Sequence, residues 1–309
     1  MKIAFMGTPD FAVDCLTALI NSKHEVVGVF CQPDKPVGRK QVLTMPPVKQ
    51  AALEAELEVF QPTTLRNGEG EKILEQIQPD LIIVVAYGKL LPVDVLDFPK
   101  YGCINIHASI LPKYRGASPI HWAVINGDKI TGVTAMQMDD GLDTGDILHI
   151  GLEQILENDT TEIMYEKLAP LGAKVLLETL EKLEKNELVA TKQDDGKATK
   201  VGLLNKETGK LDFNDLAFDI HNKIRGLYSW PCAHTKLNGK ILKIQTSRLT
   251  DEKGNNKVGE MFISGEKLLI CCGENSCIEV KELQLEGKKR MDAQGFINGY
   301  KSMLPCTLG

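Results

Sequence analysis

The stretch DLIIVVAY, from Asp80 to Tyr87, is an almost unbroken run of β-branched and aliphatic residues. Runs of this kind are typical of strands that are buried on both faces of a parallel sheet. Further short apolar runs with strand character lie around it, at 2–6, 25–31, 103–107 and 130–138. Helical patterns separate several of these runs. Strands that alternate with helices predict an open, mostly parallel α/β sheet.

Three helical patterns accompany these strands. Apolar residues recur at helix-like spacing from Phe11 to Ile20, just after a proline that suits a first helical turn. A second pattern covers 48–55, and a long amphipathic one covers 162–185. Residues 32–47 are instead rich in Pro, Gly and Lys, and they predict a loop.

The composition changes after Leu188. Residues 193–200 have almost nothing to bury, which predicts a linker. Beyond Leu211 the apolar runs are short and are separated by Gly and Asn turns, a pattern that predicts a small β-barrel or sandwich. These runs lie at 240–245, 258–263, 267–271 and 277–283.

The size and charge of the chain limit what it can be. A chain of 309 residues corresponds to two domains, at roughly 100–200 residues per domain. A net charge of −6 excludes a protein that is basic throughout and binds nucleic acid with its whole surface. Residues 200–309, however, carry 17 Lys and Arg against 13 Asp and Glu, a net +4, and the preceding part carries −10. This asymmetry fits a local polyanion-binding surface or an uneven distribution of solvated charges.

The eight cysteines are scattered and form no CxxC pair. Cys271, Cys272 and Cys277 lie close together in the sequence, but no His or second Cys pair stands at zinc spacing. We therefore expect no metal, and reduced structural thiols in a cytoplasmic protein. The first residues are too short an apolar stretch for a signal peptide, and we expect no membrane segment.

The strand at 103–107 ends with polar residues that suit catalysis. Side chains alternate along a strand, so Asn105 and His107 project from the same face. Ligands of open α/β sheets bind beyond the carboxyl ends of the strands. A His beside an Asn combines acid/base chemistry with a hydrogen-bond donor for a developing oxyanion. The alternative is that both side chains only satisfy backbone groups of the following loop.

An acidic segment follows the strand at 130–138. It contains Asp139, Asp140, Asp143 and Asp146, and one of these carboxylates could reach His107, favour its charged form and fix its tautomer. The alternative is ordinary turn or cap chemistry, for which Asp-Gly and Asp-Thr-Gly are common. Spacing alone does not choose among the four residues.

These residues carry a family resemblance. The stretch NIHASILP, from Asn105 to Pro112, followed by Gly116, resembles the signature of the folate-dependent formyltransferases. The stretch GLDTG, from Gly141 to Gly145, resembles the companion motif of that superfamily, and this resemblance selects Asp143. Matches to the branch that acts on methionyl-tRNA extend along nearly the whole chain. They include FMGTPDF (5–11), QPDKPVGR (32–39), PVK (47–49), VVAYG (84–88), WP (230–231) and GKKRM (287–291).

The resemblance implies a fold and a reaction. It implies a Rossmann-like catalytic domain at 1–189, a linker at 190–206 and an OB-like, tRNA-binding β-barrel at 207–309. It also implies transfer of a formyl group from 10-formyltetrahydrofolate, as cosubstrate, to the α-amine of methionyl initiator tRNA. No metal and no obligate protein partner are expected.

The resemblance also assigns residues. Asn105, His107 and Asp143 become the catalytic trio, and Ser109, Ile110, Leu111 and Pro112 become a folate-binding turn. Arg39 and Lys40 match a basic loop that binds tRNA, although this loop has fewer basic residues than richer family versions, which lowers the number of phosphate contacts. Further basic candidates are Lys35 and Lys49 near this loop and Lys236, Lys240, Lys243, Arg248, Lys288, Lys289 and Arg290 in the last third.

Two other functions compete with this hypothesis. A formyltransferase acting on an amino-sugar nucleotide shares the trio, but the 32–49 segment favours the tRNA branch. A catalytically silent nucleic-acid-binding protein would have no need of the trio.

Overall fold

The computed structural model describes residues 1–38, 40–254 and 257–309. The chain forms two compact units that interleave along the sequence, whereas the sequence-based division at 189 and 207 follows chain order. Unit 1 comprises Met1–Gly116, Thr131–Glu153 and Tyr165–Lys200, and unit 2 comprises Ala117–Ile130, Gln154–Met164 and Val201–Gly309.

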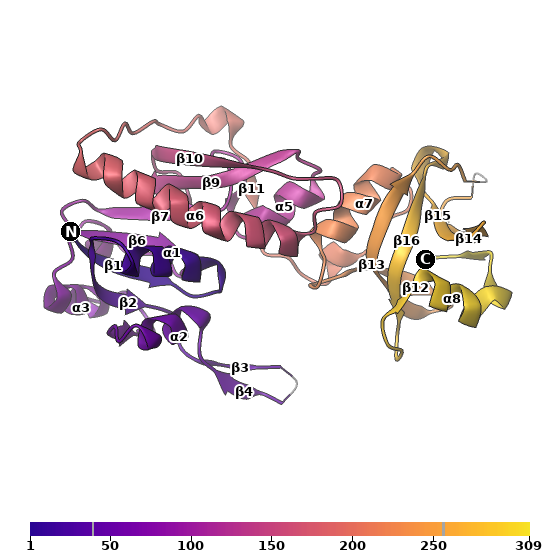
Figure 1. Cartoon of the computed structure of the whole chain (residues 1–309), viewed down its shortest axis with the longest axis horizontal. Helices are drawn as coiled ribbons and strands as arrows, with labels where there is room; N and C mark the ends of the chain where they lie inside the picture. Colours follow the sequence, from indigo (N-terminus) through magenta and orange to yellow (C-terminus); the bar gives the residue numbers. More distant parts are fainter. Residues whose placement is uncertain (39, 255–256) are drawn as a thin grey trace. The chain divides into compact units, whose positions relative to one another are not determined.

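Unit 1 is built on a seven-stranded sheet in the order β10-β9-β7-β6-β1-β2-β5 (Figure 1). Its strands are β1 (Lys2–Gly7), β2 (Glu25–Phe30), β5 (Val59–Phe60), β6 (Leu81–Val85), β7 (Cys103–His107), β9 (Ile130–Gln137) and β10 (Ile147–Gln154). Strands β5, β2, β1, β6 and β7 pair in parallel, and β9 joins β7 antiparallel. The predicted open, mostly parallel sheet is therefore confirmed, and this mixed sheet is Rossmann-like.

Helices cover both faces of this sheet, which explains the continuous apolar strands. On one face lie α1 (Phe11–Ile20) and α6 (Thr161–Glu184), where the rings of Phe11 and Tyr165 meet edge to face. On the other face, Ala4, Met6, Ile82 and Val84 share a buried cluster with residues of α3 (Glu69–Ile77) and α4 (Val93–Leu96). Alternate residues of β1 and β6 therefore face opposite helical layers.

The segment predicted as a loop at 32–47 contains a hairpin, so that prediction is wrong in this respect. Strands β3 (Lys35–Val37) and β4 (Val42–Thr44) pair antiparallel, with Val37 opposite Val42. Helix α2 (Pro47–Glu54) follows. All six strand residues are exposed, so the alternation that marks a half-buried strand is missing from the sequence. In Figure 1 the hairpin extends away from the sheet of unit 1.

Unit 2 contains a curled antiparallel sheet in the order β12-β13-β16-β15-β14-β18, and β17 also pairs with β16. The strands are β12 (Ala233–Leu237), β13 (Lys240–Thr250), β14 (Glu260–Ser264), β15 (Lys267–Cys271), β16 (Cys277–Leu285), β17 (Met291–Asp292) and β18 (Cys306–Thr307). The four strands predicted from the short apolar runs are confirmed. This sheet is the barrel-like part of the predicted fold.

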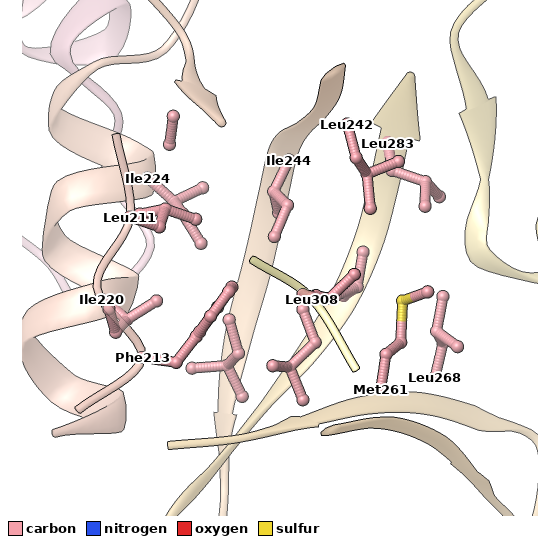
Figure 2. Packing of buried hydrophobic residues seen from close by; sticks show 14 of the residues in the cluster. Leu211, Phe213, Ile220, Ile224, Leu242, Ile244, Met261, Leu268, Leu283 and Leu308 are labelled. Carbon is pink, nitrogen blue, oxygen red and sulfur yellow. The ribbon is translucent and has the colours of Figure 1, made fainter. Parts of the chain in front are cut away.

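Among the described residues, the α-helices that lie wholly in unit 2 are α5 (Pro119–Ile125), α7 (Ala217–Gly226) and α8 (Ala293–Tyr300). Figure 2 shows Ile220 and Ile224 of α7 directed toward Ile244 of β13, within one buried apolar cluster. Helix α5 lies against α7 so closely that a Cβ at Gly226 would come within 2.5 Å of the Ile125 side chain. Glycine is therefore required at this crossing. Among the described helices, none has both the length and the apolar character needed to cross a bilayer.

Candidate active site

Asn105 and His107 lie at the carboxyl end of β7, in the interior of the sheet. Strand β6 flanks β7 on one side and β9 on the other, where Asn105 is opposite Met136 and His107 is opposite Thr134. The two side chains are almost buried, with exposed fractions of 9% and 7%. The alternation along β7 places both on one face, as the sequence predicts.

Asp143 reaches both of these residues from the loop between β9 and β10. Its Oδ1 lies 3.5 Å from Asn105 Nδ2, and its Oδ2 lies 3.8 Å from His107 Nδ1. The backbone N–H of Gly116 donates to the same Oδ2 at 2.7 Å. The carboxylate is thus anchored by a backbone donor, while its contacts with the amide and the imidazole are longer.

The structure distinguishes the four aspartates of this loop, of which Asp146 is half-buried. The Asp139 carboxylate closes the turn, because it accepts hydrogen bonds from the Gly141 N–H at 3.0 Å and from the Thr144 hydroxyl at 2.7 Å. Asp140 is exposed. Asp143 adopts a left-handed backbone conformation with φ of 54°, and this conformation brings its side chain to Asn105 and His107.

Hydrogen bonding determines which nitrogen of His107 carries a proton. Nε2 lies 3.0 Å from the carbonyl oxygen of Tyr114, which can only accept, so Nε2 is the donor. Nδ1 faces the Asp143 carboxylate. This arrangement suits a proton relay between the imidazole and a reacting group.

The turn after β7, predicted to bind folate, is tightly tied to its surroundings. The Ser109 hydroxyl is buried and donates to the Lys113 carbonyl at 2.7 Å. Thr134 Oγ1 donates to the Ser109 carbonyl at 2.6 Å and accepts from the Leu111 N–H at 3.2 Å. Leu111 is buried, whereas Ile110 and Pro112 are half-buried and offer apolar surface. Ser109 therefore holds the turn in shape.

The basic residues of the hairpin fall into two groups. Arg39 lies outside the described residues, and Lys40 beside it is exposed. Lys49 is instead held within the protein, because its Nζ donates to both carboxylate oxygens of Asp34, at 2.9 and 2.8 Å, and to Gln61 Oε1 at 2.7 Å. Hydrogen bonds from Lys49 and Gln61 lower the pKa of Asp34 below its ordinary value. Lys49 thus closes the base of the hairpin.

The basic candidates of unit 2 are mostly exposed. Lys236, Lys240, Arg248, Lys288 and Lys289 are exposed, and Lys243 is half-buried. Arg290 differs from the others: it forms an ion pair with Glu282 and lies 5.5 Å from the centre of the Tyr228 ring. Its charge is therefore partly compensated within the protein.

Two residues that support the site were not singled out from the sequence. Arg115 is 3% exposed and Gln193 is 6% exposed, and Arg115 Nε donates to Gln193 Oε1 at 3.0 Å. The prediction that 193–200 has almost nothing to bury is wrong for Gln193. A lone glutamine in a polar stretch carries no sequence signal of burial. In the part of the chain that the structure describes, no three His, Cys, Asp or Glu side chains are grouped to hold a metal ion.

Comparison with known proteins adds to this geometry. Residues 1–180 match the family described as formyl transferase, and residues 203–301 match the formyl transferase C-terminal domain. The methionyl-tRNA formyltransferase of Alkaliphilus oremlandii is 45% identical over 97% of this chain and 96% of that protein. The methionyl-tRNA formyltransferase of Desulfotalea psychrophila is 47% identical over 97% of this chain and 93% of that protein.

A solved structure shares the fold. The N-formyltransferase from Helicobacter canadensis, in complex with folinic acid and dTDP-3-aminofucose, has a TM-score of 0.69 to this chain at 23% identity. The match covers 91% of this chain and 98% of that one.

Proposed function

The chain belongs to the formyl transferase family, and from this membership we propose that it formylates methionyl initiator tRNA for translation initiation. The formyl donor is 10-formyltetrahydrofolate, and the acceptor is the α-amine of the esterified methionine. Identity of about 45% along nearly the whole length of enzymes that carry out this reaction is the observation that carries the proposal. The amino-sugar formyltransferase is similar at only 23% identity, which favours the tRNA as acceptor.

The reaction is an acyl transfer. The amine nitrogen attacks the formyl carbon and loses a proton, a tetrahedral oxyanion forms, and the bond to N10 of the folate breaks as N10 gains a proton. In this mechanism the Asn105 side-chain amide donates a hydrogen bond to the oxyanion, an interaction worth roughly 3–4 kcal/mol in comparable sites. Its Nδ2 is only weakly engaged, at 3.5 Å from Asp143.

His107 and Asp143 move the proton. With Nε2 committed to the Tyr114 carbonyl, Nδ1 exchanges a proton with the reacting groups. The Asp143 carboxylate, 3.8 Å from Nδ1, stabilises the imidazolium that results. An imidazolium beside the oxyanion also stabilises its negative charge.

The folate is a cosubstrate that this site can accommodate. Ile110 and Pro112 present apolar surface directly after β7, which suits a flat pterin and benzoyl ring, and Leu111 backs them from the core. Ser109 shapes this turn through its bond to Lys113.

We assign the tRNA contacts to Arg39 and Lys40 of the hairpin and to the exposed lysines of unit 2. Functional domains at 1–189 and 207–309, joined by a linker at 190–206, are part of the same proposal. The eight free cysteines suit the reducing cytoplasm, where we place the enzyme.

The test is transfer of labelled formyl from 10-formyltetrahydrofolate to methionyl initiator tRNA, with a 4-amino-sugar nucleotide as parallel acceptor. We expect product on the tRNA alone. Asn105→Ala should lower kcat about 10²–10³-fold with little change in either KM, because the interaction that it removes belongs to the transition state. Asn298→Ala, in α8 of unit 2, is the matched control. Transfer to the sugar alone would contradict the acceptor assignment, and transfer to neither would contradict the reaction.

A further inference from the structure

Gln193 extends from a polar segment into the loop that carries Asp143. Its neighbours Lys192 and Asp194 are exposed, whereas Gln193 itself is 6% exposed. Both hydrogens of its amide are used on this loop: Nε2 donates to the Asp143 carbonyl at 2.9 Å and to the Gly145 carbonyl at 2.7 Å. One side chain from a distant part of the sequence therefore spans the residues on which the catalytic carboxylate is mounted.

The other end of the Gln193 amide is fixed as well. Oε1 accepts from Arg115 Nε at 3.0 Å, and Arg115 is followed by Gly116, whose N–H donates to Asp143 Oδ2. These bonds close a ring that runs from Gln193 through Arg115 and Gly116 to Asp143 and back. The ring holds the backbone of Asp143 from one side and its carboxylate from the other.

The local conformation of Asp143 makes such support necessary. Its φ of 54° lies in the left-handed region, which residues other than glycine adopt only at some cost in backbone strain. Its contacts with Asn105 and His107, at 3.5 and 3.8 Å, are too long to hold it by themselves. The hydrogen bonds from the Gln193 amide and from the Gly116 N–H are short and well formed, and they can hold Asp143 in place.

We propose that Gln193 is a positioning residue for the formyl transfer reaction, acting through Asp143. This inference rests on the proposed function only for its kinetic test. Substituting Gln193 should lower kcat, because its hydrogen bonds place Asp143, which acts on the reacting atoms. These bonds do not involve the folate turn or the hairpin, so the KM values should change little. A small displacement of a reacting group is enough to reduce the rate substantially.

The test is a double-mutant cycle between Gln193 and Asp143. Gln193→Ala should lower kcat about 10–100-fold while both KM values stay within about twofold. In an Asp143→Ala background the same substitution should have almost no further effect, because the group that it positions is gone. Gln193→Met, which keeps the length of the side chain and removes its donors, replaces the alanine variant if that variant does not fold.

Two controls separate positioning from general stability. Gln245→Ala removes a glutamine of similar burial from β13 and should leave kcat unchanged. In protein labelled with ¹⁵N-histidine, the His107 ring signals should shift alike in Gln193→Ala and Asp143→Ala. Multiplicative losses in the cycle, or unmoved ring signals, would overturn the positioning role. Ring signals that shift in a protein whose wild type does not formylate tRNA would support the positioning role and reject the proposed function.

Discussion

The proposed catalytic residues Asn105, His107 and Asp143 are joined by long polar contacts, and this bears on their chemistry. The Asp143 carboxylate lies 3.5 Å from the Asn105 amide and 3.8 Å from His107, whereas its bond to the Gly116 N–H is 2.7 Å. The Asn105 amide and His107 Nδ1 are thus only weakly engaged by Asp143, whereas His107 Nε2 is bound to the Tyr114 carbonyl. The pairing of Asn105 with His107 could be predicted from strand alternation. The choice of Asp143 could not be derived from spacing, since it depends on a left-handed backbone angle.

Asp143→Asn should lower kcat roughly 10²-fold or more, because an amide does not stabilise a charged His107. Its oxygen can still accept from Gly116, so the loop should keep its shape. Asp140→Asn is a change of the same kind at an exposed position of the same loop, and its kcat should stay within about twofold of the wild-type value. Steady-state kinetics with both substrates saturating checks this. Equal losses in the two variants would mean that loop charge, and not the placement of Asp143, matters.

At the scale of elements, the β3–β4 hairpin depends on a polar network at its base. Asp34 precedes β3 and Lys49 lies in α2 after β4, so their ion pair joins the two ends of the hairpin. Gln61 donates to Asp34 Oδ1 at 2.8 Å and to the Gln32 carbonyl at 2.8 Å. Sequence alone presents Lys49 as one more basic residue of the loop. The contacts that give it another role join residues from separate elements and carry no local pattern.

Lys49→Met should raise the KM for methionyl-tRNA about tenfold and leave the KM for the folate within about twofold. The substitution leaves the half-buried Asp34 carboxylate without its cation and removes the ion pair that joins the two ends of the hairpin. Lys23→Met, which removes an exposed lysine paired with Glu184, is the control. An unchanged KM for tRNA would show that the hairpin does not need this ion pair to bind.

At the scale of the whole molecule, charge and histidine burial differ between parts of the chain. The basic excess predicted for residues 200–309 appears in unit 2 as exposed lysines at 236, 240, 288 and 289. The class of sheet in each unit, mostly parallel in one and barrel-like in the other, could be predicted from the sequence, whereas the order of the strands came from the structure. The interleaving of the units could not be predicted either, because it depends on α5 packing against α7, which lies far along the chain.

The KM for methionyl-tRNA should rise steeply with salt, since tRNA binding releases counterions. Replacing Lys236 or Lys240 by Ala should reduce the slope of log KM against log salt by roughly 0.7–0.9 for each phosphate that the variant no longer neutralises. Lys267→Ala, which removes a lysine already paired with Glu252, should leave the slope unchanged. Kinetics from 50 to 300 mM KCl, about the range in which such slopes are read, provide the measurement. Identical slopes in all variants would reject these lysines as phosphate contacts.

Acid should destabilise unit 2 through two of its histidines. Burial lowers the pKa of His121 to about 4 and lowers that of His221, whose Nε2 donates to the Glu157 carbonyl at 2.9 Å. Between pH 6.5 and about 4, His121 binds a proton in the unfolded chain but stays neutral in the folded protein. The free energy of unfolding is therefore greatest above pH 6.5 and decreases as the pH falls below it. As the pH falls through this window, the free energy of unfolding measured in urea should decrease by roughly 2–3 kcal/mol less in His121→Gln than in the wild type. Parallel pH curves for variant and wild type would contradict the assignment.

The interleaved course of the chain has a consequence for biosynthesis. The ribosome completes α5 long before α7 emerges, and Ile120, Ala123 and Val124 of α5 are buried in the finished protein. During that interval α5 lacks the helix against which it packs, so unit 2 cannot complete its folding simply after unit 1 in the order of translation. A premature stop near residue 200 would leave α5 permanently without α7. Such a fragment would retain the proposed catalytic residues Asn105, His107 and Asp143 and yet be prone to aggregate.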